Sequence, residues 1–494
     1  MRLLPSPLPL AFSTRHAGVL AIALVAAIHG YGLSSTHSSA PPPARPAVAA
    51  PRTAPATRVV PAPRSKPTQA QPRPAQKPPQ QPPRQPVPQQ PYRPTPVPNY
   101  GRSYPNPSSP VAPRVFPGER VVNAADGSQR IYANNGALRS VSANGMKIQH
   151  GPGNARVISA MHPDGSRATV MPGGGGWVQH PFSYRGAQYA RRSYSAGYGS
   201  FDRYYRIYPW RGVNLSIYRP VRYYPASYYW WLGNPWGGGF SFSWGWGAAP
   251  WYGYYGGAFT PYSTYSSPAM WLTDYTLGDS MNSAYQQDQA DGSANGQAPA
   301  INPMPDTVKE SVNKEIEIDA GTLQQESQQE TSGDTLSAPA GSLAQVLSSN
   351  QPRTFVAGAK LMLVDSNGNE CALTPGDVVQ YAPGGALAGT TAVNVQVTWS
   401  KDGRDCATGS TVTVAYDDLQ EMQNHLLGTV DQGIDQMRGA QTAGKLPQTP
   451  QGLRANPTSN GFAAVAPGAD TNVQSELDSQ SRDADKAEQG GSSQ

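Results

Sequence analysis

A proline-rich block most limits what this chain can fold into. Of its 51 prolines, 26 lie between Pro41 and Pro117, among Gln, Ala and Arg and with few large aliphatic residues. Such a segment cannot bury enough apolar surface to offset the entropy cost of ordering it. Residues 41–118 are therefore predicted to be a disordered, polyproline-rich linker, so the folded part is much smaller than 494 residues.

The N-terminus has the pattern of an export signal. Arg2, Arg15 and His16 precede an uninterrupted apolar run of 12 residues, Ala17–Ile28. That length is typical of the apolar region of a signal peptide, whereas a membrane span needs about 20 residues. Residues 1–40 are therefore predicted to export the chain to the periplasm, the cell envelope or the outer surface. The pattern leaves open whether the segment is cleaved or stays as an anchor.

Turn signals recur from Glu119 onward. SANG at 142–145 and HPDG at 162–165 are two of them, and short runs with strand composition, such as MKIQ and RATVM, lie between the turns. Asn-Gly and Asp-Gly favour two-residue hairpin turns because these residues tolerate positive φ. The module at 119–275 is therefore predicted to begin as a β-hairpin meander.

The second part of that module is rich in aromatic rings. Residues 177–275 hold 9 Trp, 18 Tyr and 5 Phe. Phe240, Phe242, Trp244 and Trp246 occur at period two, which in a strand places all four rings on one face. Such a face could stack on sugars, on a membrane interface or on another copy of the chain. The alternative is a glycine-aromatic loop that packs on its own sheet.

Charge is divided unevenly along the chain. Residues 1–273 carry 27 basic and 4 acidic side chains, whereas residues 274–494 carry 11 and 28. Arginines alternate with aromatic residues around 203–222, a spacing that favours cation–π contacts. A basic aromatic surface attracts polyanions. For an exported protein, the expected partner is an envelope polyanion, a polysaccharide or a protein, with membrane-interface contact possible and nucleic acid not expected.

The residues predicted to bind this partner are arginines and rings of the same module. They are Arg203, Arg206, Arg211, Phe240, Phe242, Trp244, Trp246, Trp251, Tyr252 and Tyr254. A merely solvated basic surface is the alternative interpretation. No cofactor is predicted, and the spacing of the seven histidines gives no metal motif.

The charge reversal near Asp274 marks a predicted boundary. Residues 276–349 are predicted to be a polar linker with one short amphipathic helix at 306–318. The tail at 441–494 is small and polar and is predicted to be disordered.

Residues 350–440 have the pattern of a compact domain. In AVNVQVTWS the side chains of Val393, Val395, Val397 and Trp399 share one face of a strand. We predict a small β-barrel or sandwich of about five strands, closed by one helix whose apolar stripe begins at Leu419. This domain and the meander are expected to fold as two separate modules.

Both cysteines of the chain lie in that domain. Cys371 and Cys406 each flank a predicted strand, and in an exported protein they are expected to form a disulfide. A cysteine nucleophile would need a base. His425 is the only histidine in the domain and is expected on a solvent-facing position of the helix.

The order of these parts resembles a family of uncharacterised exported proteins of Gram-negative bacteria. The likeness rests on RYYRIYPWRGV and YRPVRYYPASYYWW, on the Gly/Trp/Tyr segment that follows, and on YDDLQEMQNHLLGTVDQGIDQM after the two cysteines. It covers residues 119–440. The resemblance implies an envelope setting, with no known activity and no residue roles.

The sequence therefore favours a protein that is mainly β with long disordered segments, and that is exported and non-enzymatic. It would act as a structural or interaction protein of the envelope, binding through its basic aromatic module. A carbohydrate- or peptidoglycan-binding module is the alternative, with Trp and Tyr rings as stacking platforms. A hydrolase is less favoured because the sequence pairs no nucleophile with a base. The oligomeric state is left open.

Overall fold

The fold is that of a computed structural model of the chain. It describes residues 119–489 except for 126, 134, 151–155, 197–198, 291, 293–298, 336, 367–369, 386–390, 403–405 and 454–455. The predicted export segment at 1–40 and the predicted linker at 41–118 lie outside the described residues.

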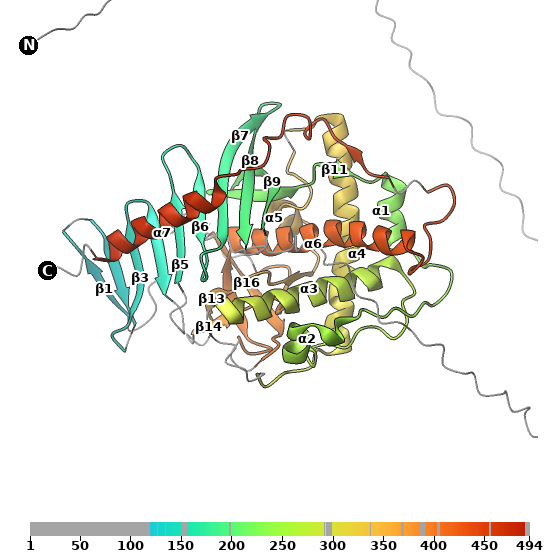
Figure 1. The fold of residues 1–494 in the computed structure, drawn as a ribbon, viewed down its shortest axis with the longest axis horizontal. Helices are drawn as coiled ribbons and strands as arrows, with labels where there is room; N and C mark the ends of the chain where they lie inside the picture. Colours follow the sequence, from blue (N-terminus) through green and yellow to red (C-terminus); the bar gives the residue numbers. More distant parts are fainter. Residues whose placement is uncertain are drawn as a thin grey trace, which may run out of the picture. The chain divides into compact units, whose positions relative to one another are not determined.

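A ten-stranded antiparallel sheet is the largest element (Figure 1). Each strand pairs with its neighbours in sequence, so the predicted hairpin meander and the mainly β class are confirmed. The strands are β1 (Arg120–Asn123), β2 (Gln129–Tyr132), β3 (Leu138–Ala143), β4 (Met146–His150), β5 (Arg156–Met161), β6 (Arg167–Val170), β7 (Gly176–Tyr184), β8 (Ala187–Ala196), β9 (Gly199–Trp210) and β10 (Val213–Arg219).

The turn between β3 and β4 illustrates why the sequence predicts this meander. Asn144 and Gly145 have φ of 51° and 75°, the left-handed conformation that a type I′ turn needs. A Cβ on Gly145 would lie 2.9 Å from the carbonyl oxygen of Met161, so glycine is required there. This two-residue turn sets the register of the hairpin, which places Val141 opposite Ile148.

Helix α7 (Val473–Gln489) packs on one face of the meander, against β3 and β5 to β8 (Figure 1). Its Val473, Leu477 and Ala484 are buried among apolar side chains of the strands. The prediction of a disordered tail at 441–494 is therefore wrong for this segment. A helix of this composition forms because the sheet covers its apolar side, which the tail sequence alone does not reveal.

Two further sheets form the C-terminal β region. One has four strands in the order β12-β15-β16-β17, and the other is the hairpin β13-β14. An isolated bridge between Asp365 and Val412 links them. The strands are β12 (Arg353–Val356), β13 (Leu361–Val364), β14 (Glu370–Leu373), β15 (Val378–Tyr381), β16 (Ala392–Trp399) and β17 (Thr411–Ala415).

The predicted alternation of buried and outward-facing side chains in β16 is confirmed. Val393, Val395, Val397 and Trp399 are each at most 1% exposed, whereas Gln396 between them is exposed. The disulfide Cys371–Cys406 is also confirmed, with a Cα–Cα distance of 4.8 Å, and it ties β14 to the segment before β17. Closure of these sheets into a barrel stays a prediction.

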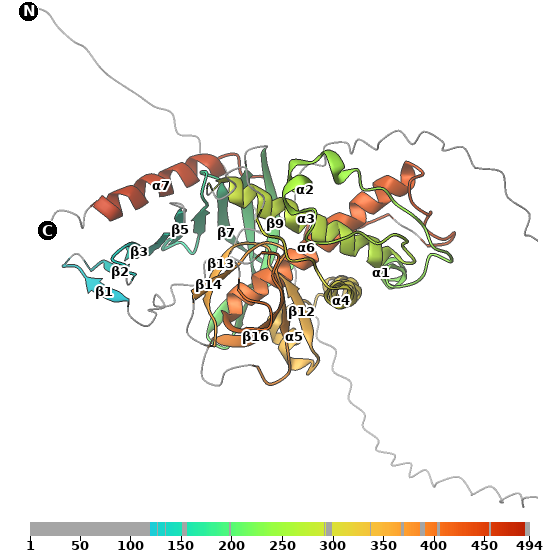
Figure 2. The same ribbon diagram turned by 90° about the horizontal axis from the view of Figure 1, so that it is seen from below.

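Three long helices pack on one another next to these sheets, and one of them, α4, runs across the other two (Figure 2). They are α3 (Pro268–Ala290), α4 (Asp306–Ser332) and α6 (Tyr416–Thr442). The shorter helical segments are α1 (Ala226–Leu232), η2 (Trp246–Ala248), α2 (Pro250–Tyr255) and α5 (Leu343–Ser348). A short pair of strands, β11 (Arg222–Tyr223) and β18 (Thr458–Ser459), completes the described elements.

Much of the helical structure lies in residues that the sequence predicts to be a linker. Helix α3 continues to Ala290, through the first half of the expected linker at 276–305, and α4 continues to Ser332 instead of ending near Ile318. Val308, Val312 and Ile316 do share the buried side of α4, as predicted. Beyond them the buried side of α4 is mostly polar, so a search for apolar periodicity misses the rest of the helix.

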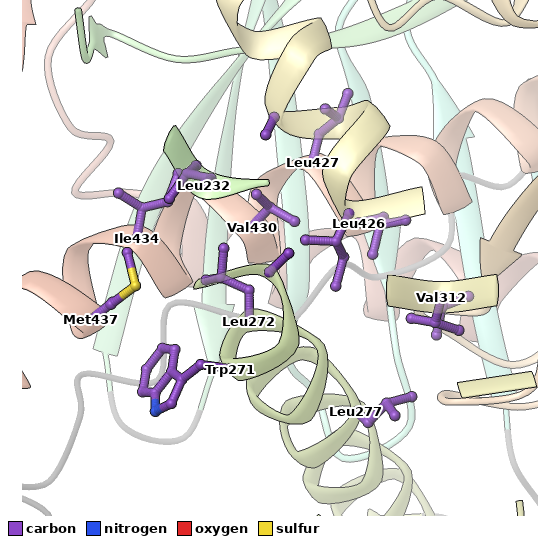
Figure 3. Packing of buried hydrophobic residues seen from close by; sticks show 14 of the residues in the cluster. Leu232, Trp271, Leu272, Leu277, Val312, Leu426, Leu427, Val430, Ile434 and Met437 are labelled. Atoms are coloured by element: carbon purple, nitrogen blue, oxygen red, sulfur yellow. The ribbon is translucent and has the colours of Figure 1, made fainter. Parts of the chain in front are cut away.

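Helix α6 is the predicted closing helix, and it lies at the centre of the packing (Figure 3). Its stripe is buried as expected, with Leu426, Val430 and Ile434 all at 0% exposure. The same helix also packs on β10, α3 and α4. It is therefore buried on several sides rather than covering one sheet.

The meander and the C-terminal β region share their cores. One cluster of buried residues includes Leu215 and Ile217 of β10 together with Val395 of β16. A second joins Tyr205 of β9 to Trp399. The prediction of two separately folded modules is therefore wrong for the described residues, because neither module completes its core without the other.

Asn424 of α6 connects the two parts through the free edge of β10. Its side-chain amide donates to the carbonyl oxygen of Ser216 at 2.7 Å and accepts from the backbone N–H of Tyr218 at 2.9 Å. These two backbone groups point away from β9, so without Asn424 they would be buried and unpaired. The amide thus replaces a neighbouring strand and protects the sheet edge.

Replacing Asn424 by alanine should lower the free energy of unfolding by about 3 kcal/mol, because a buried donor and a buried acceptor lose their partner. Urea unfolding followed by tryptophan fluorescence measures this. Gln396→Ala, at an exposed position of β16, serves as the control and should change stability by less than about 0.5 kcal/mol. Equal effects in both variants would show that Asn424 does not hold the edge of β10.

Candidate functional site

The aromatic segment predicted to bind a partner does not form a strand. Phe240 makes an isolated bridge to Tyr265, and the following residues are irregular until η2 and α2. Glycines at 237–239, 245 and 247 leave the backbone free to follow the rings instead of a pleated strand. The predicted flat row of four rings is therefore wrong.

The tryptophans of the segment stack on α3 instead. The ring of Trp244 lies between those of Trp246 and Trp271, with centroid distances of 4.5 and 4.7 Å. Tyr275, one turn along α3, stacks on the far side of Trp271 at 5.7 Å. Trp246 fits because residue 278 is glycine, where a Cβ would lie 2.6 Å from the indole ring.

Buried polar groups fix this stack. The indole N–H of Trp244 donates to the hydroxyl of Tyr265 at 2.6 Å, and that hydroxyl donates to Asp274 at 2.6 Å. Lys309 of α4 forms an ion pair with the same carboxylate at 2.7 Å and lies 3.5 Å from the ring centroid of Tyr262. The aromatic segment is thus anchored to both α3 and α4.

This arrangement leaves little ring surface for a ligand. Both faces of Trp244 are covered, and Trp251 and Tyr254 are buried at 7% and 9% exposure. The prediction that Trp251 and Tyr254 contact a partner at the surface is therefore wrong. Phe240, Phe242, Trp246 and Tyr252 are partly buried against the same core, so the alternative of a self-packing aromatic loop describes this segment better.

Two of the three predicted arginines are also inside. Arg203 is 8% exposed, and its guanidinium lies so close to α6 that a Cβ on Gly428 would be 2.8 Å from Nη1. Arg206 is 5% exposed and donates to the carbonyl oxygen of Thr335. The prediction that these two arginines attract a partner at the surface is wrong.

Buried arginines of the meander pair with acidic residues of the C-terminal helices. Arg192 of β8 is 0% exposed and makes two hydrogen bonds to Glu421 of α6, at 2.9 and 3.0 Å. Its guanidinium also lies 4.3 Å from the ring centroid of Trp177 and 4.1 Å from that of Tyr205. A bidentate pair of this kind is among the stronger charge interactions in proteins.

The same pairing recurs at other helices. Arg219 of β10 contacts Glu330 of α4 at 2.6 Å, and Arg191 contacts Asp470 at 2.7 Å. Arg156 contacts Asp485 of α7 at 2.6 Å. Within the described residues, these arginines of the meander are therefore paired with acidic side chains of the C-terminal half of the chain.

Arg211 remains on the surface. It occupies the turn between β9 and β10, where Arg211 and Gly212 have φ of 47° and 83°. The turn between β7 and β8 has the same form, with Arg185 at 47° and Gly186 at 76°. The sequence interpretation missed Arg185, although the repeated order aromatic–Arg–Gly is visible in it.

Each of these turn arginines lies against the ring that precedes it. Arg185 is 5.0 Å from the ring centroid of Tyr184, and Arg211 is 4.8 Å from that of Trp210. Successive turns of a meander alternate between its two ends, so both turns belong to the same end of the sheet. The Arg185 side chain is 47% exposed, and Arg211 is also exposed.

The buried side of α4 carries carboxyl groups that have an oxygen without a hydrogen-bond partner among the described residues. Glu326 is 0% exposed; one oxygen accepts from Tyr223 at 3.3 Å, and Oε1 has no hydrogen-bond partner among the described residues. Burial raises the pKa of Glu326 to about 8. The pKa of Asp319 is likewise raised well above its ordinary value, first by burial and second by the negative charge of the neighbouring Glu315.

His425 is not on the surface, in contrast to the prediction. It is 1% exposed, and its Nε2 lies 3.4 Å from the hydroxyl oxygen of Ser280. Burial, with the charge of Arg203 adding to it, lowers the pKa of His425 to about 3. Nδ1 has no hydrogen-bond partner in the described part of the chain, so no acid orients this histidine as a triad would require.

Comparisons of the chain with protein-family models, with curated proteins and with solved structures find no match. The likeness to exported envelope proteins therefore stays a prediction. Within the described residues, no helix is both long enough and apolar enough to cross a membrane.

Stability should depend on pH through Glu326. Its pKa is about 8 in the folded chain and near 4.5 when unfolded, so folding retains a proton that the unfolded chain loses. The resulting stabilisation is complete below about pH 4.5 and is lost as pH rises through about 8. Glu326→Gln should therefore gain stability relative to wild type as pH rises from 5 to 9.

Urea unfolding of both proteins at several pH values in that range measures this difference. Glu310→Gln, at an exposed position of the same helix, is the control and should show no such trend. A constant difference between Glu326→Gln and wild type would show that Glu326 is already ionised in the folded chain.

The aromatic stack should contribute to stability. Trp244→Ala removes a ring packed on both faces and should lower the free energy of unfolding by about 2 to 3 kcal/mol. Trp230→Ala is the control, because Trp230 is 66% exposed and should change stability by less than about 0.5 kcal/mol. If thermal and urea unfolding leave Trp244→Ala as stable as wild type, the stack does not support the core.

Proposed function

We propose that this chain is an exported, non-enzymatic cell-envelope protein that binds an anionic envelope polymer through Arg185 and Arg211. The observation that carries the proposal is the pair of Arg-Gly turns at one end of the meander. Each turn presents a guanidinium beside an aromatic ring at the protein surface. Arginine combined with a ring suits contact with phosphate, sulfate or carboxylate groups on a polymer.

The use of arginine at these positions is costly, which supports a functional role. Both arginines have the left-handed φ that a side chain other than Gly, Asn or Asp adopts with strain of about 1 kcal/mol or more. The β3–β4 turn of the same sheet meets the same requirement with Asn144. The chain thus uses the favourable residue at the β3–β4 turn and arginine at the β7–β8 and β9–β10 turns.

The other arginines of the predicted binding set are less suitable. Arg203 and Arg206 are buried. The positive charge of Arg185 is partly compensated, because its Nη1 lies 3.9 Å from the carboxylate of Glu330. That carboxylate pairs more closely with Arg219, at 2.6 Å. Arg185 and Arg211 therefore remain the best placed for a polyanion.

Two features support export, one in the N-terminal sequence and one in the C-terminal β region. The apolar run at 17–28 has the length of a signal region. The Cys371–Cys406 disulfide suits an oxidising compartment such as the periplasm. Stacking of sugars on Trp244 is less favoured as a function, because both faces of that ring are covered by other tryptophans.

The double variant Arg185→Asn/Arg211→Asn separates binding from folding. Asparagine is better suited to the left-handed turn position, but the variant also loses the hydrogen bonds that Arg211 donates to the Tyr416 hydroxyl at 3.2 Å and Arg185 donates to the Glu330 carbonyl oxygen at 3.3 Å. The variant should therefore stay within about 1 kcal/mol of wild type in its free energy of unfolding. Binding to dextran sulfate should nevertheless weaken at least tenfold, and wild-type binding should weaken steeply between about 50 and 300 mM salt. Biolayer interferometry with the full chain measures both.

Lys314→Gln is the charge control: it removes one positive charge from an exposed position of α4, whereas the double variant removes two. It should change the affinity for dextran sulfate less than twofold. Uncharged dextran tests the sugar-stacking alternative. Unchanged binding in the double variant, or equal binding of wild type to uncharged dextran, would contradict the proposal.

A further inference from the structure

Three potential metal ligands from distant parts of the chain meet at the start of α7. His180 lies on β7, Asp470 precedes α7, and Glu476 is in its first turn. His180 Nε2 is 3.5 Å from Asp470 Oδ2 and 3.4 Å from Glu476 Oε2. One ligand atom from each residue lies within 4.8 Å of the other two.

The three ligand atoms are close enough together to share one cation. One imidazole and two carboxylates form a ligand set that Zn²⁺ accepts, with water in the remaining position. The side chains of His180 and Glu476 are 35% and 39% exposed, so an ion can reach them from solvent.

Neighbouring groups already orient the central carboxylate. Arg191 Nη2 donates to Asp470 Oδ2 at 2.7 Å, and the backbone N–H of Asn472 donates to Asp470 Oδ1 at 2.9 Å. His180 lies directly opposite Arg191 in the β7–β8 ladder. Such outer contacts fix a ligand before the metal arrives and still leave lone pairs on the carboxylate for the ion. The positive charge of Arg191 opposes the ion, which limits the expected affinity.

We propose that His180, Asp470 and Glu476 form a binding site for Zn²⁺ that tethers α7 to strand β7. The apolar contact of α7 with the sheet is small, resting mainly on Val473, Leu477 and Ala484. A metal bridge between the strand and the first turn of the helix would hold that contact in place. The site is independent of the turn arginines, so it does not rest on the proposed polymer binding.

Isothermal titration calorimetry of the full chain with ZnCl₂ at neutral pH tests the site. Wild type should bind one Zn²⁺ through it, and both His180→Ala and Glu476→Gln should weaken that event at least tenfold. Amide hydrogen exchange provides a second readout. Zn²⁺ should slow exchange in α7 of wild type and leave exchange in α7 of His180→Ala unchanged.

His150→Ala is the matched control, because His150 contacts Glu488 at the other end of α7, at 3.0 Å. It should leave Zn²⁺ binding at the site unchanged even if it loosens the helix. Absence of Zn²⁺ binding by wild type would overturn the proposal. Binding that persists at full strength in His180→Ala would also overturn it, because another histidine would be responsible.

Discussion

The pairing of arginines on the meander with carboxylates on the C-terminal helices is the interaction on which the rest of the structure depends. Arg192 with Glu421 and Arg219 with Glu330 are buried pairs that link β8 to α6 and β10 to α4. Removing one partner from such a pair leaves a buried charge uncompensated, which costs several kcal/mol. The meander and the acidic C-terminal helices are therefore parts of one folded unit, and meander arginines that seemed available for an external polyanion are paired inside it.

That internal use changes which residues are left for function. The tryptophans stack on one another and on α3, and they support the core rather than a ligand. Arg203 and Arg206 are enclosed by the helices that pack on the sheet. Arg185 and Arg211, by contrast, keep exposed side chains at turn positions where the left-handed φ strains the backbone. The division between structural and interacting residues thus follows from burial, not from residue type.

The helices that complete the core bring polar groups with them. Asn424 satisfies the edge of β10, Gln423 donates to Asp319 at 2.7 Å, and Glu326 is buried with one oxygen unpaired. Paired amides of this kind specify one arrangement of helices and strands, because any shift leaves a buried polar group without a partner. Burial disfavours the charged form of a carboxyl group, and it raises the pKa of Glu326 to about 8. Specific packing and pH sensitivity therefore have the same origin in this protein.

The sequence by itself determined the local features. The hairpin turns, the two-residue alternation of β16 and the apolar stripe of α6 follow from short-range patterns, and the Cys371–Cys406 pair follows from the presence of two cysteines in the chain. Only the tertiary structure decided what those elements cover. Helices α3, α4 and α7 carry polar or mixed faces that are stable because the meander supplies opposite charges and apolar surface. The meeting of His180 with Asp470 and Glu476, and the burial of Arg203 and His425, depend on contacts between segments far apart in the chain. Such contacts leave no periodic signal, because their partners are chosen by the fold as a whole and not by neighbours in sequence.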